Sequence, residues 1–348
     1  MKVVVTGATG NVGTSVLRSL TKEPAVDSIV GIARRIPDTS FPKTRWVGAD
    51  VSRDDLVPLF AGADAVIHLA WAIQPSRDLL KVRETNVLGS QRVAEAVAEA
   101  RVPALLYASS IGAYSPGPKD RAVDERWPVN GVSTSFYSRH KAEVEALLDG
   151  FEQATPGIRL VRLRKALIFK SEAATGIRRL FAGPFLPAGI VKPGRIPILP
   201  DLKGLRFQCV HSYDVAEAYR LALTSDVRGP FNIAADPVLD LKSVARIMRA
   251  RPVPVPRALV RAAAEVSWRV RLQPSPPGWF DLAVESPIMD TTKAMDELGW
   301  YPSFSSIDAF HDLIQGLNRK EGAGTPPLDP RTSGPFRSAE LGTGMGGQ

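Results

Sequence analysis

Tyr137 and Lys141 stand four residues apart in the segment Tyr-Ser-Arg-His-Lys, a spacing that places two side chains on the same face of a helix. A free phenol has a pKa of about 10 and is a poor base at neutral pH, whereas a nearby ammonium group favours the phenolate. Upstream, Ser109 and Ser110 end an apolar run that begins at Ala104. A serine at a strand end can hydrogen-bond a substrate oxygen and stabilise its developing charge. These residues could together move a proton at that oxygen.

Each of these features is common by itself. A Tyr-x-x-x-Lys pair on a helix is more often a surface pair, and serines at a strand end usually satisfy local backbone groups. A third motif, at the start of the chain, supports the interpretation that these residues act together in catalysis. The segment 5–13 reads Val-Thr-Gly-Ala-Thr-Gly-Asn-Val-Gly and starts at the last residue of the apolar, β-branched run 1–5.

The three glycines of this motif are Gly7, Gly10 and Gly13, and a helical pattern of apolar residues starts at Asn11. Strand, glycine turn and helix form the arrangement in which backbone N–H groups and a helix N-terminus meet a pyrophosphate. Gly7 would allow the tight turn, Gly10 the close approach of the phosphates and Gly13 the packing of helix on strand. An ordinary structural turn is the alternative, but the position directly after a strand favours a dinucleotide site.

Alternating strands and helices must position these motifs. The patterns predict strands at 2–6, 28–33, 44–48, 65–70, 104–109 and 158–163, and helices at 11–22, 53–60, 78–100 and 135–152. Strands separated by helices imply a parallel sheet covered on both faces, with its ligand crevice at the carboxyl ends of the strands. The predicted fold class is α/β, a doubly wound parallel (Rossmann) sheet with a smaller, irregular C-terminal substrate lobe.

The predicted domains follow from where this alternation stops. Residues 1–165 form the dinucleotide-binding domain, to which later segments return, and residues 166–318 form the substrate lobe. The lobe includes a Pro- and Gly-rich stretch at 183–204 and helices at 213–225, 239–249, 257–271 and 305–317. Residues 319–348 are expected to be a disordered tail, since from residue 321 onward the chain has seven glycines, four prolines and few apolar residues.

Composition bounds the remaining possibilities. With 348 residues, 44% of them hydrophobic, the chain can bury a large core. One cysteine excludes an internal disulfide framework, and four scattered histidines do not form a zinc-binding pattern, so no metal is expected. The first strand leaves no room for a signal peptide, and no apolar run is long enough for stable membrane insertion. We therefore expect a cytoplasmic protein.

The net charge of +8 is concentrated in one stretch. Between Arg246 and Arg271 there are seven arginines and a single acid, Glu265. The simpler interpretation is a charged, solvated helix face with internal ion pairs along Arg257, Arg261, Glu265 and Arg269, whose other side (Leu259, Val260, Ala263, Val266, Val270) packs inward. The alternative is a surface for an anionic ligand, a partner or a membrane. No aromatic-rich motif supports nucleic-acid binding.

Taken together, the motifs resemble the extended short-chain dehydrogenases/reductases, in the group of NAD(P)-dependent epimerases and dehydratases. The resemblance covers about residues 1–317. It rests on the glycine motif, Asp50-Val51, His68-Leu69-Ala70, Asn86-Val87-Leu88-Gly89, Ser109-Ser110 with Tyr114, Tyr137 with Lys141, and the stretch Val210-His211-Ser212-Tyr213-Asp214-Val215.

The resemblance implies roles for individual residues. Tyr137 is the catalytic acid/base, Lys141 holds the nicotinamide ribose and lowers the tyrosine pKa, and Ser110 rather than Ser109 polarises the substrate. Asn86 holds the structure around the site, and Asp214 caps the helix that it begins. The predicted cofactor-binding residues are Gly7, Thr9, Gly10, Asn11, Val12, Gly13, Arg34, Arg35, Asp50, Val51, Leu69, Ala70, Tyr137 and Lys141.

The end of the second strand bears on the choice of cofactor. NAD enzymes usually carry an acid there for the ribose 2′-hydroxyl, whereas this chain has Ala33, Arg34 and Arg35. Two arginines could pair with a 2′-phosphate, which favours NADP over NAD. The alternative is two exposed arginines near the adenine with NAD bound through backbone contacts.

The substrate lobe departs from the family pattern. Arg164-Lys165-Ala166 stands where relatives commonly have Arg-Pro-Gly, and Phe207 stands where the epimerase type has a diphosphate-binding arginine, with Arg206 one step away. The aromatic and aliphatic residues Trp71, Ile73, Phe181, Phe185 and Phe207 could line an apolar pocket or form ordinary core. The first hypothesis is therefore an oxidoreductase acting on a carbonyl or secondary alcohol of a small molecule. A sugar-nucleotide epimerase/dehydratase and a non-catalytic nucleotide sensor are the alternatives, and the family implies a homodimer.

Overall fold

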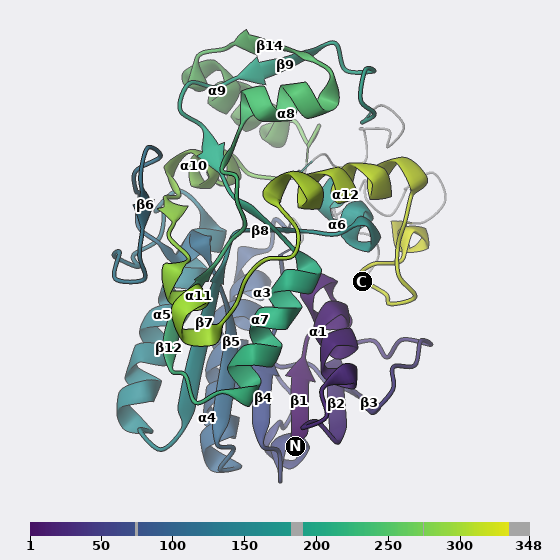
Figure 1. Ribbon diagram of the computed structural model, residues 1–348, viewed down its shortest axis with the longest axis vertical. Coiled ribbons are helices and arrows are strands. Elements are labelled where there is room, and N and C mark those ends of the chain that lie inside the picture. Colours follow the sequence, from purple (N-terminus) through teal and green to yellow (C-terminus); the bar gives the residue numbers. More distant parts are fainter. Residues whose placement is uncertain (74–75, 182–190, 274, 334–348) are drawn as a thin grey trace.

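Seven parallel strands form the central sheet of the computed structural model, which describes residues 1–73, 76–181, 191–273 and 275–333. The strand order is β12-β7-β5-β4-β1-β2-β3, so the chain winds outward in both directions from β1 (Figure 1). The strands are β1 (Lys2–Thr6), β2 (Ser28–Ala33), β3 (Thr44–Gly48), β4 (Ala65–His68), β5 (Ala104–Ser110), β7 (Arg159–Lys165) and β12 (Gly229–Ile233). The doubly wound α/β class predicted from the sequence is confirmed.

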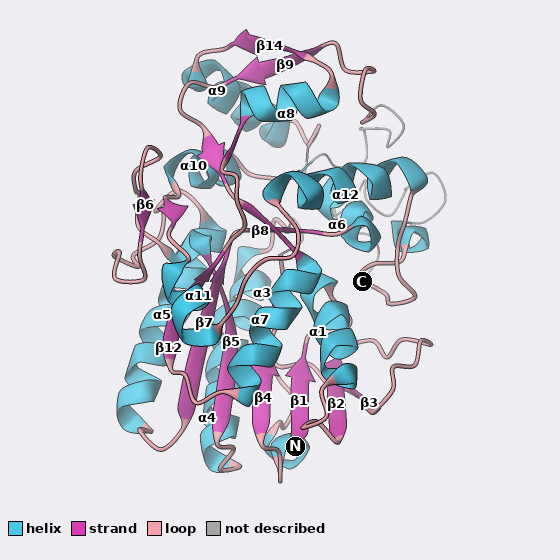
Figure 2. Cartoon of the chain, viewed as in Figure 1, coloured by secondary structure: helices cyan, strands magenta, loops and turns pink. Residues whose placement is uncertain are grey.

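Helices cover both faces of the sheet, as Figure 2 shows. Side chains alternate along each strand, so Val3 and Val5 belong to the core under α1 (Asn11–Lys22) and α7 (Ser212–Thr224). Val4 belongs to the core of the opposite face. That face carries α2 (Val57–Phe60), α4 (Gly89–Glu99) and α5 (Phe136–Ala154). Because α7 and β12 come from the second half of the chain, that half completes the sheet and one of its helical layers.

The long helix expected over residues 78–100 is divided. It consists of α3 (Leu79–Arg83), a π-helical turn (Glu84–Leu88) and α4. Asn86 lies in the π-helical turn, is fully buried, and bonds both its amide groups to the backbone of Ala72. Turns of this kind are frequent at functional sites, and this one holds the loop that follows β4.

A smaller lobe lies beyond the carboxyl ends of the sheet strands (Figure 1). Its strands pair in twos: β8 (Leu167–Phe169) with β11 (Cys209–His211), β9 (Ile198–Asp201) with β14 (Arg251–Pro254), β10 (Arg206–Phe207) with β13 (Leu239–Asp240), and β6 (Ala122–Val123) with β15 (Ile288–Met289). Its helices are α6 (Ala174–Phe181), α8 (Leu241–Met248), α9 (Arg257–Arg269), α10 (Gly278–Glu285) and α12 (Ser306–Arg319). The helix α11 (Thr292–Leu298) instead packs against β12 and α7 at the sheet. None of the described helices is long and apolar enough to cross a membrane.

The chain remains packed beyond α12. Thr325 and Leu328 are buried, and the Thr325 hydroxyl donates a hydrogen bond to the carbonyl oxygen of Thr9 over 2.8 Å. Thr39, which follows β2, donates to the carbonyl of Gly324 over 2.9 Å. The ordered chain therefore extends past residue 319, where the tail was expected to begin, and residues 334–348 lie outside the described part.

Candidate active site

The glycine motif forms the turn between β1 and α1. Gly7 has a φ of +68°, and a Cβ there would lie 2.6 Å from the backbone nitrogen of Ala70. A Cβ on Gly13 would lie 2.5 Å from the carbonyl oxygen of Gly7. Both positions therefore require glycine, the first for its conformation and both for close packing.

Gly10 differs from the other two glycines. Among the described residues, a Cβ at Gly10 would approach only the carbonyl oxygen of Gly7, at 3.4 Å, so protein atoms do not fill its outer side. Gly10 is also the N-cap of α1; it has no side chain to cap the helix, and the first turn has no acidic residue. The free N–H groups and the positive helix end suit an anion. The residues present thus fit the pyrophosphate of a dinucleotide.

The predicted adenosine-binding residues gather at the ends of β2 and β3. Ala33 is buried at the end of β2, and Arg34 and Arg35 are exposed just after it. The Asp50 carboxylate accepts hydrogen bonds from the backbone and hydroxyl of Ser52. Burial raises the pKa of Asp50, but these hydrogen bonds and the charge of Arg34 outweigh it, so the pKa is lowered. Arg34 and Asp50 therefore lie close enough to interact.

The loop after β4 forms the next part of the crevice. The Leu69 N–H donates to the carbonyl oxygen of Thr6, and the Ala70 N–H donates to its hydroxyl. The same hydroxyl is 2.7 Å from Nδ1 of His68. Burial lowers the pKa of His68 to about 3, so this imidazole is neutral and structural. The predicted pair Leu69 and Ala70 is thus fixed beside the glycine turn.

Ser110 and Tyr137 meet at the carboxyl end of β5. Tyr137 lies in the first turn of α5, which Ser135 caps by accepting from the Ser138 N–H. Burial raises the pKa of Tyr137 to about 12, and a hydrogen bond with Ser110 lowers it in part. Gly112 allows this approach, since a Cβ there would lie 2.8 Å from the tyrosine ring. The pKa thus lies above its ordinary value here, contrary to the lowering expected from the sequence.

Lys141 faces the same end of β5 from one helical turn further on. Its amine donates to the carbonyl oxygen of Ala108 over 2.6 Å and to the Tyr107 hydroxyl over 3.3 Å. The nitrogen also lies 3.4 Å from the ring centroid of Trp71. Burial, followed by the charge of Lys165, holds the pKa of Lys141 well below its usual range. A lowered lysine pKa weakens the support that this amine can give to a phenolate, whereas burial is what raises the pKa of Tyr137.

Ser109 has a different role from its neighbour. Its hydroxyl donates to the carboxylate of Glu145, which is 1% exposed and also accepts from Arg164 over 2.9 and 3.0 Å. Arg164 in turn donates to the Tyr114 hydroxyl. This buried network ties α5 to β5 and β7 behind the site. The preference for Ser110 over Ser109 thus agrees with the geometry, although its catalytic role stays a prediction.

Trp279 was missed by the sequence analysis. The first residue of α10, Gly278, packs so closely on the start of α5 that a Cβ would lie 2.4 Å from the Thr134 carbonyl oxygen. The neighbouring Trp279 ring then lies 4.8 Å from the Tyr137 ring, centroid to centroid. Trp71 approaches the same tyrosine edge-on at 6.0 Å. The only sequence signal was the turn-forming run Pro-Pro-Gly before Trp279.

The other residues proposed for the apolar pocket are dispersed. Ile73 is 37% exposed, and Phe207 packs in the lobe core with Cys209 and Leu239. Phe185 and the side chain of Phe181 lie outside what the structure describes. The Arg206 guanidinium donates to the Lys119 carbonyl over 2.9 Å. Trp71 alone of the described members contacts the predicted catalytic residues.

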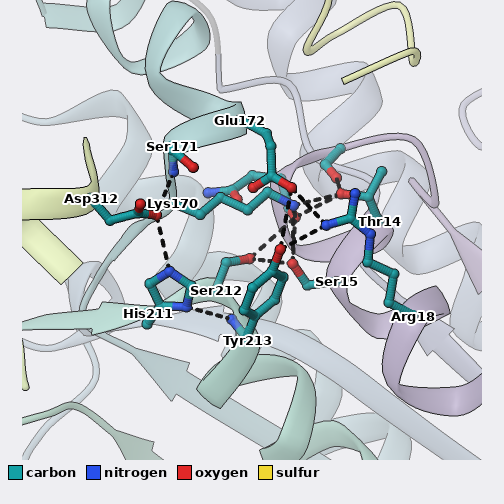
Figure 3. A network of polar contacts seen from close by, with 12 residues as sticks. Thr14, Ser15, Arg18, Lys170, Ser171, Glu172, His211, Ser212, Tyr213 and Asp312 are labelled. Atoms are coloured by element: carbon teal, nitrogen blue, oxygen red, sulfur yellow. Dashed lines mark hydrogen bonds and ion pairs between the residues drawn. The ribbon is translucent and has the colours of Figure 1, made fainter. Parts of the chain in front are cut away.

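A second polar network joins the lobe to α1 (Figure 3). The amine of Lys170 donates to the Asn11 carbonyl and to the hydroxyls of Thr14 and Ser15 over 2.7–3.0 Å. Burial lowers the pKa of Lys170 to about 8. At its edge, Arg18 pairs with Glu172 over 2.6 Å. This network fixes the start of α1, and with it the glycine turn, against the lobe.

The fold and these sites define a dinucleotide-binding protein of the extended short-chain dehydrogenase/reductase type. The family model described as "NAD dependent epimerase/dehydratase family" matches residues 3–234. The chain therefore belongs to the NAD-dependent epimerase/dehydratase family, which is a family of enzymes.

The individual proteins that resemble this chain share less than a third of its residues. An uncharacterized protein of Mycobacterium tuberculosis, Rv2047c, is 26% identical over 93% of this chain, which spans only 31% of that relative's length. A UDP-glucose 4-epimerase of Neisseria meningitidis is 28% identical over 72% of this chain and 81% of its own. Among solved structures, MoeE5 in complex with UDP-glucuronic acid and NAD has a TM-score of 0.68 at 20% identity, covering 92% of this chain and all of that one. That likeness shows the shared fold.

Proposed function

We propose that the chain catalyses hydride transfer at a secondary alcohol or carbonyl of a small molecule, with Tyr137 as acid/base. The single observation that supports this most is the meeting of Ser110 and Tyr137 at the carboxyl end of β5, beside Lys141. Those residues lie at the edge of the sheet where the glycine turn would hold a dinucleotide. Nicotinamide, when bound, supplies the hydride acceptor or donor.

In the oxidative direction, the substrate O–H proton goes to the deprotonated oxygen of Tyr137 as the carbon loses its hydride, which leaves a carbonyl. Ser110 hydrogen-bonds the reacting oxygen, and Lys141 holds the nicotinamide ribose. Trp71 and Trp279 flank the tyrosine, which favours a substrate with an apolar or ring-shaped body beside its reacting carbon. The indole N–H of Trp71 is buried and has no acceptor among the described residues, so it can donate to a bound ligand.

Replacing Tyr137 with phenylalanine tests this proposal. Tyr137→Phe should lower turnover by about 100-fold or more, because it removes the proton carrier, while the affinity for cofactor, measured by fluorescence titration, stays within about twofold. Tyr301→Phe is the matched control, since Tyr301 is 65% exposed and lies outside the networks described above. Turnover that is indifferent to Tyr137→Phe would overturn the mechanism.

A sugar-nucleotide 4-epimerase is the second candidate, because UDP-glucose 4-epimerases are among the relatives. Phe207 at the diphosphate position and the bonding of Arg206 to Lys119 speak against it. The two reactions differ in their net products. An oxidoreductase releases one NADH for each alcohol oxidised, whereas an epimerase converts UDP-glucose to UDP-galactose with no net NADH. Binding of cofactor without either reaction would indicate the nucleotide sensor instead.

A further inference from the structure

The helix α9 presents an apolar face to solvent. Leu259, Ala262, Val266 and Val270 follow one another at steps of three and four residues, which places them on one side of the helix. All four are exposed, with Leu259 at 62% and both valines at 59%, and α9 contains no buried residue. The inward packing predicted for Leu259, Val266 and Val270 is therefore wrong.

The polar side of α9 explains this orientation. Arg261 pairs with Asp281 of α10 over 2.8 Å, and Arg257 donates to the Lys203 carbonyl over 2.6 and 3.0 Å. On the same side, Trp268 stacks against the guanidinium of Arg77. The arginines thus attach the helix to the protein, which leaves the apolar stripe outside.

The segment that carries this stripe is strongly basic. Residues 241–273 contain eight lysines and arginines and one acid, Glu265, which pairs with Arg269 over 2.5 Å. Arg249, Arg251 and Arg271 are exposed. They stand at or next to the ends of α8, β14 and α9, three elements that Figure 1 shows at the end of the lobe farthest from the sheet.

We propose that this end of the lobe docks on a membrane surface that contains anionic lipids, with α9 lying in the interface. An exposed apolar stripe within a strongly basic segment matches acyl chains beneath anionic headgroups. Duplex DNA would use the arginines but leave the exposed stripe without a partner. The ion pair of Arg261 with Asp281 also links α9 to α10, the helix that carries Trp279.

Vesicle flotation with the full chain tests this proposal, and it needs no substrate, so its outcome is independent of the proposed reaction. The protein should float with phosphatidylcholine vesicles that contain phosphatidylglycerol, and less with phosphatidylcholine alone or at high salt. Leu259→Gln/Val266→Gln/Val270→Gln should weaken binding about tenfold or more, and Arg249→Gln/Arg251→Gln/Arg271→Gln should remove the preference for the anionic lipid. Tyr301→Gln, at a residue that is 65% exposed elsewhere, should change nothing.

Three outcomes would overturn the proposal. The first is no flotation with either lipid, and the second is flotation that the apolar triple variant leaves unchanged. The third is a wild-type protein that binds no lipid but forms an oligomer by light scattering, where the apolar triple variant is a smaller species. The stripe would then be covered by a second copy of the chain. Because the substituted side chains are exposed, each variant should keep the wild-type unfolding temperature, which separates loss of binding from loss of fold.

Discussion

Buried amines dominate the electrostatics of the predicted catalytic residues. Lys165 ends β7 beside Ser110 of β5, and its amine donates to the Tyr219 hydroxyl over 3.0 Å. Burial lowers the pKa of Lys165 to about 7, and this lysine contributes to the lowered pKa of Lys141. Burial raises the pKa of Tyr137 to about 12, so the phenol is protonated in the free protein. A ligand that raises the pKa of Lys141 would favour the tyrosinate beside it.

Lys165→Met should raise stability at neutral pH. In the unfolded chain the lysine keeps its ordinary pKa of 10.5, against about 7 in the fold. Between these two pH values the lysine is protonated in the unfolded chain and neutral in the folded one. The destabilisation of the fold by Lys165 is therefore complete below about pH 7 and disappears towards pH 10.5. The gain is roughly a few kcal/mol at neutral pH, reduced by the orphaned Tyr219 hydroxyl.

The measurement is the unfolding temperature of both proteins across this pH range. The difference between variant and wild type should shrink as the pH rises. Lys242→Met, at an exposed residue, is the control and should show no such trend. A Lys165→Met difference that stays constant with pH would contradict the assignment.

Replacement of the single side chain of Arg34 tests whether the chain binds NADP or NAD. The family description names NAD, and no comparison supports the NADP preference that the sequence indicated. If NADP is bound, Arg34→Ala should weaken NADPH about tenfold, through loss of a charged hydrogen bond, and leave NADH unchanged in parallel fluorescence titrations. Arg53→Ala, with a side chain 77% exposed near Asp50, is the control. Higher affinity for NADH, unaffected by the variant, would establish NAD.

Elements with one dominant signal were predicted well. The strands β1, β2 and β3 and the helix α1 match the predicted ranges, because β-branched runs and glycines act locally. The π-helical turn at Glu84–Leu88 was not predictable, since the register change depends on the bond of Asn86 to Ala72. Asp214 was also misjudged. His211 caps α7, and the Asp214 carboxylate instead accepts from the N–H groups of Ser303 and Phe304.

The residues of the candidate site also differ in how well the sequence could predict them. Ser110, Tyr137 and Lys141 could be found because their spacing reflects one strand and one helix. Trp279 could not, because it comes from α10, 142 positions after Tyr137, and reaches the site only through the docking of the lobe. The prediction of how α9 is oriented was wrong for a related reason. Apolar periodicity identifies a stripe, but the partners of Arg257 and Arg261 decide which side faces the protein.

At the scale of the molecule, the segment after α12 closes a loop from the C-terminal lobe back to the glycine turn. Thr325 is 1% exposed and bonds to Thr9, one residue before Gly10. Thr39, four residues after Arg35 in the sequence, donates a hydrogen bond to the carbonyl oxygen of the neighbouring Gly324. A glycine turn that is already fixed in the free protein loses less conformational entropy on dinucleotide binding than a mobile turn would. We therefore expect this segment to strengthen cofactor binding.

Thr325→Val, which keeps the shape of the side chain, should weaken cofactor binding about fivefold, the equivalent of one hydrogen bond. Removal of residues 320–348 should weaken it further and speed amide exchange in residues 6–12, which report on the turn directly. Thr224→Val is the control, since its hydroxyl donates to the carbonyl oxygens of Arg220 and Leu221 within α7. If the shortened chain instead binds the cofactor more tightly, the segment obstructs the site. Unchanged affinity and unchanged exchange would mean that the contact with Thr9 plays no part in binding.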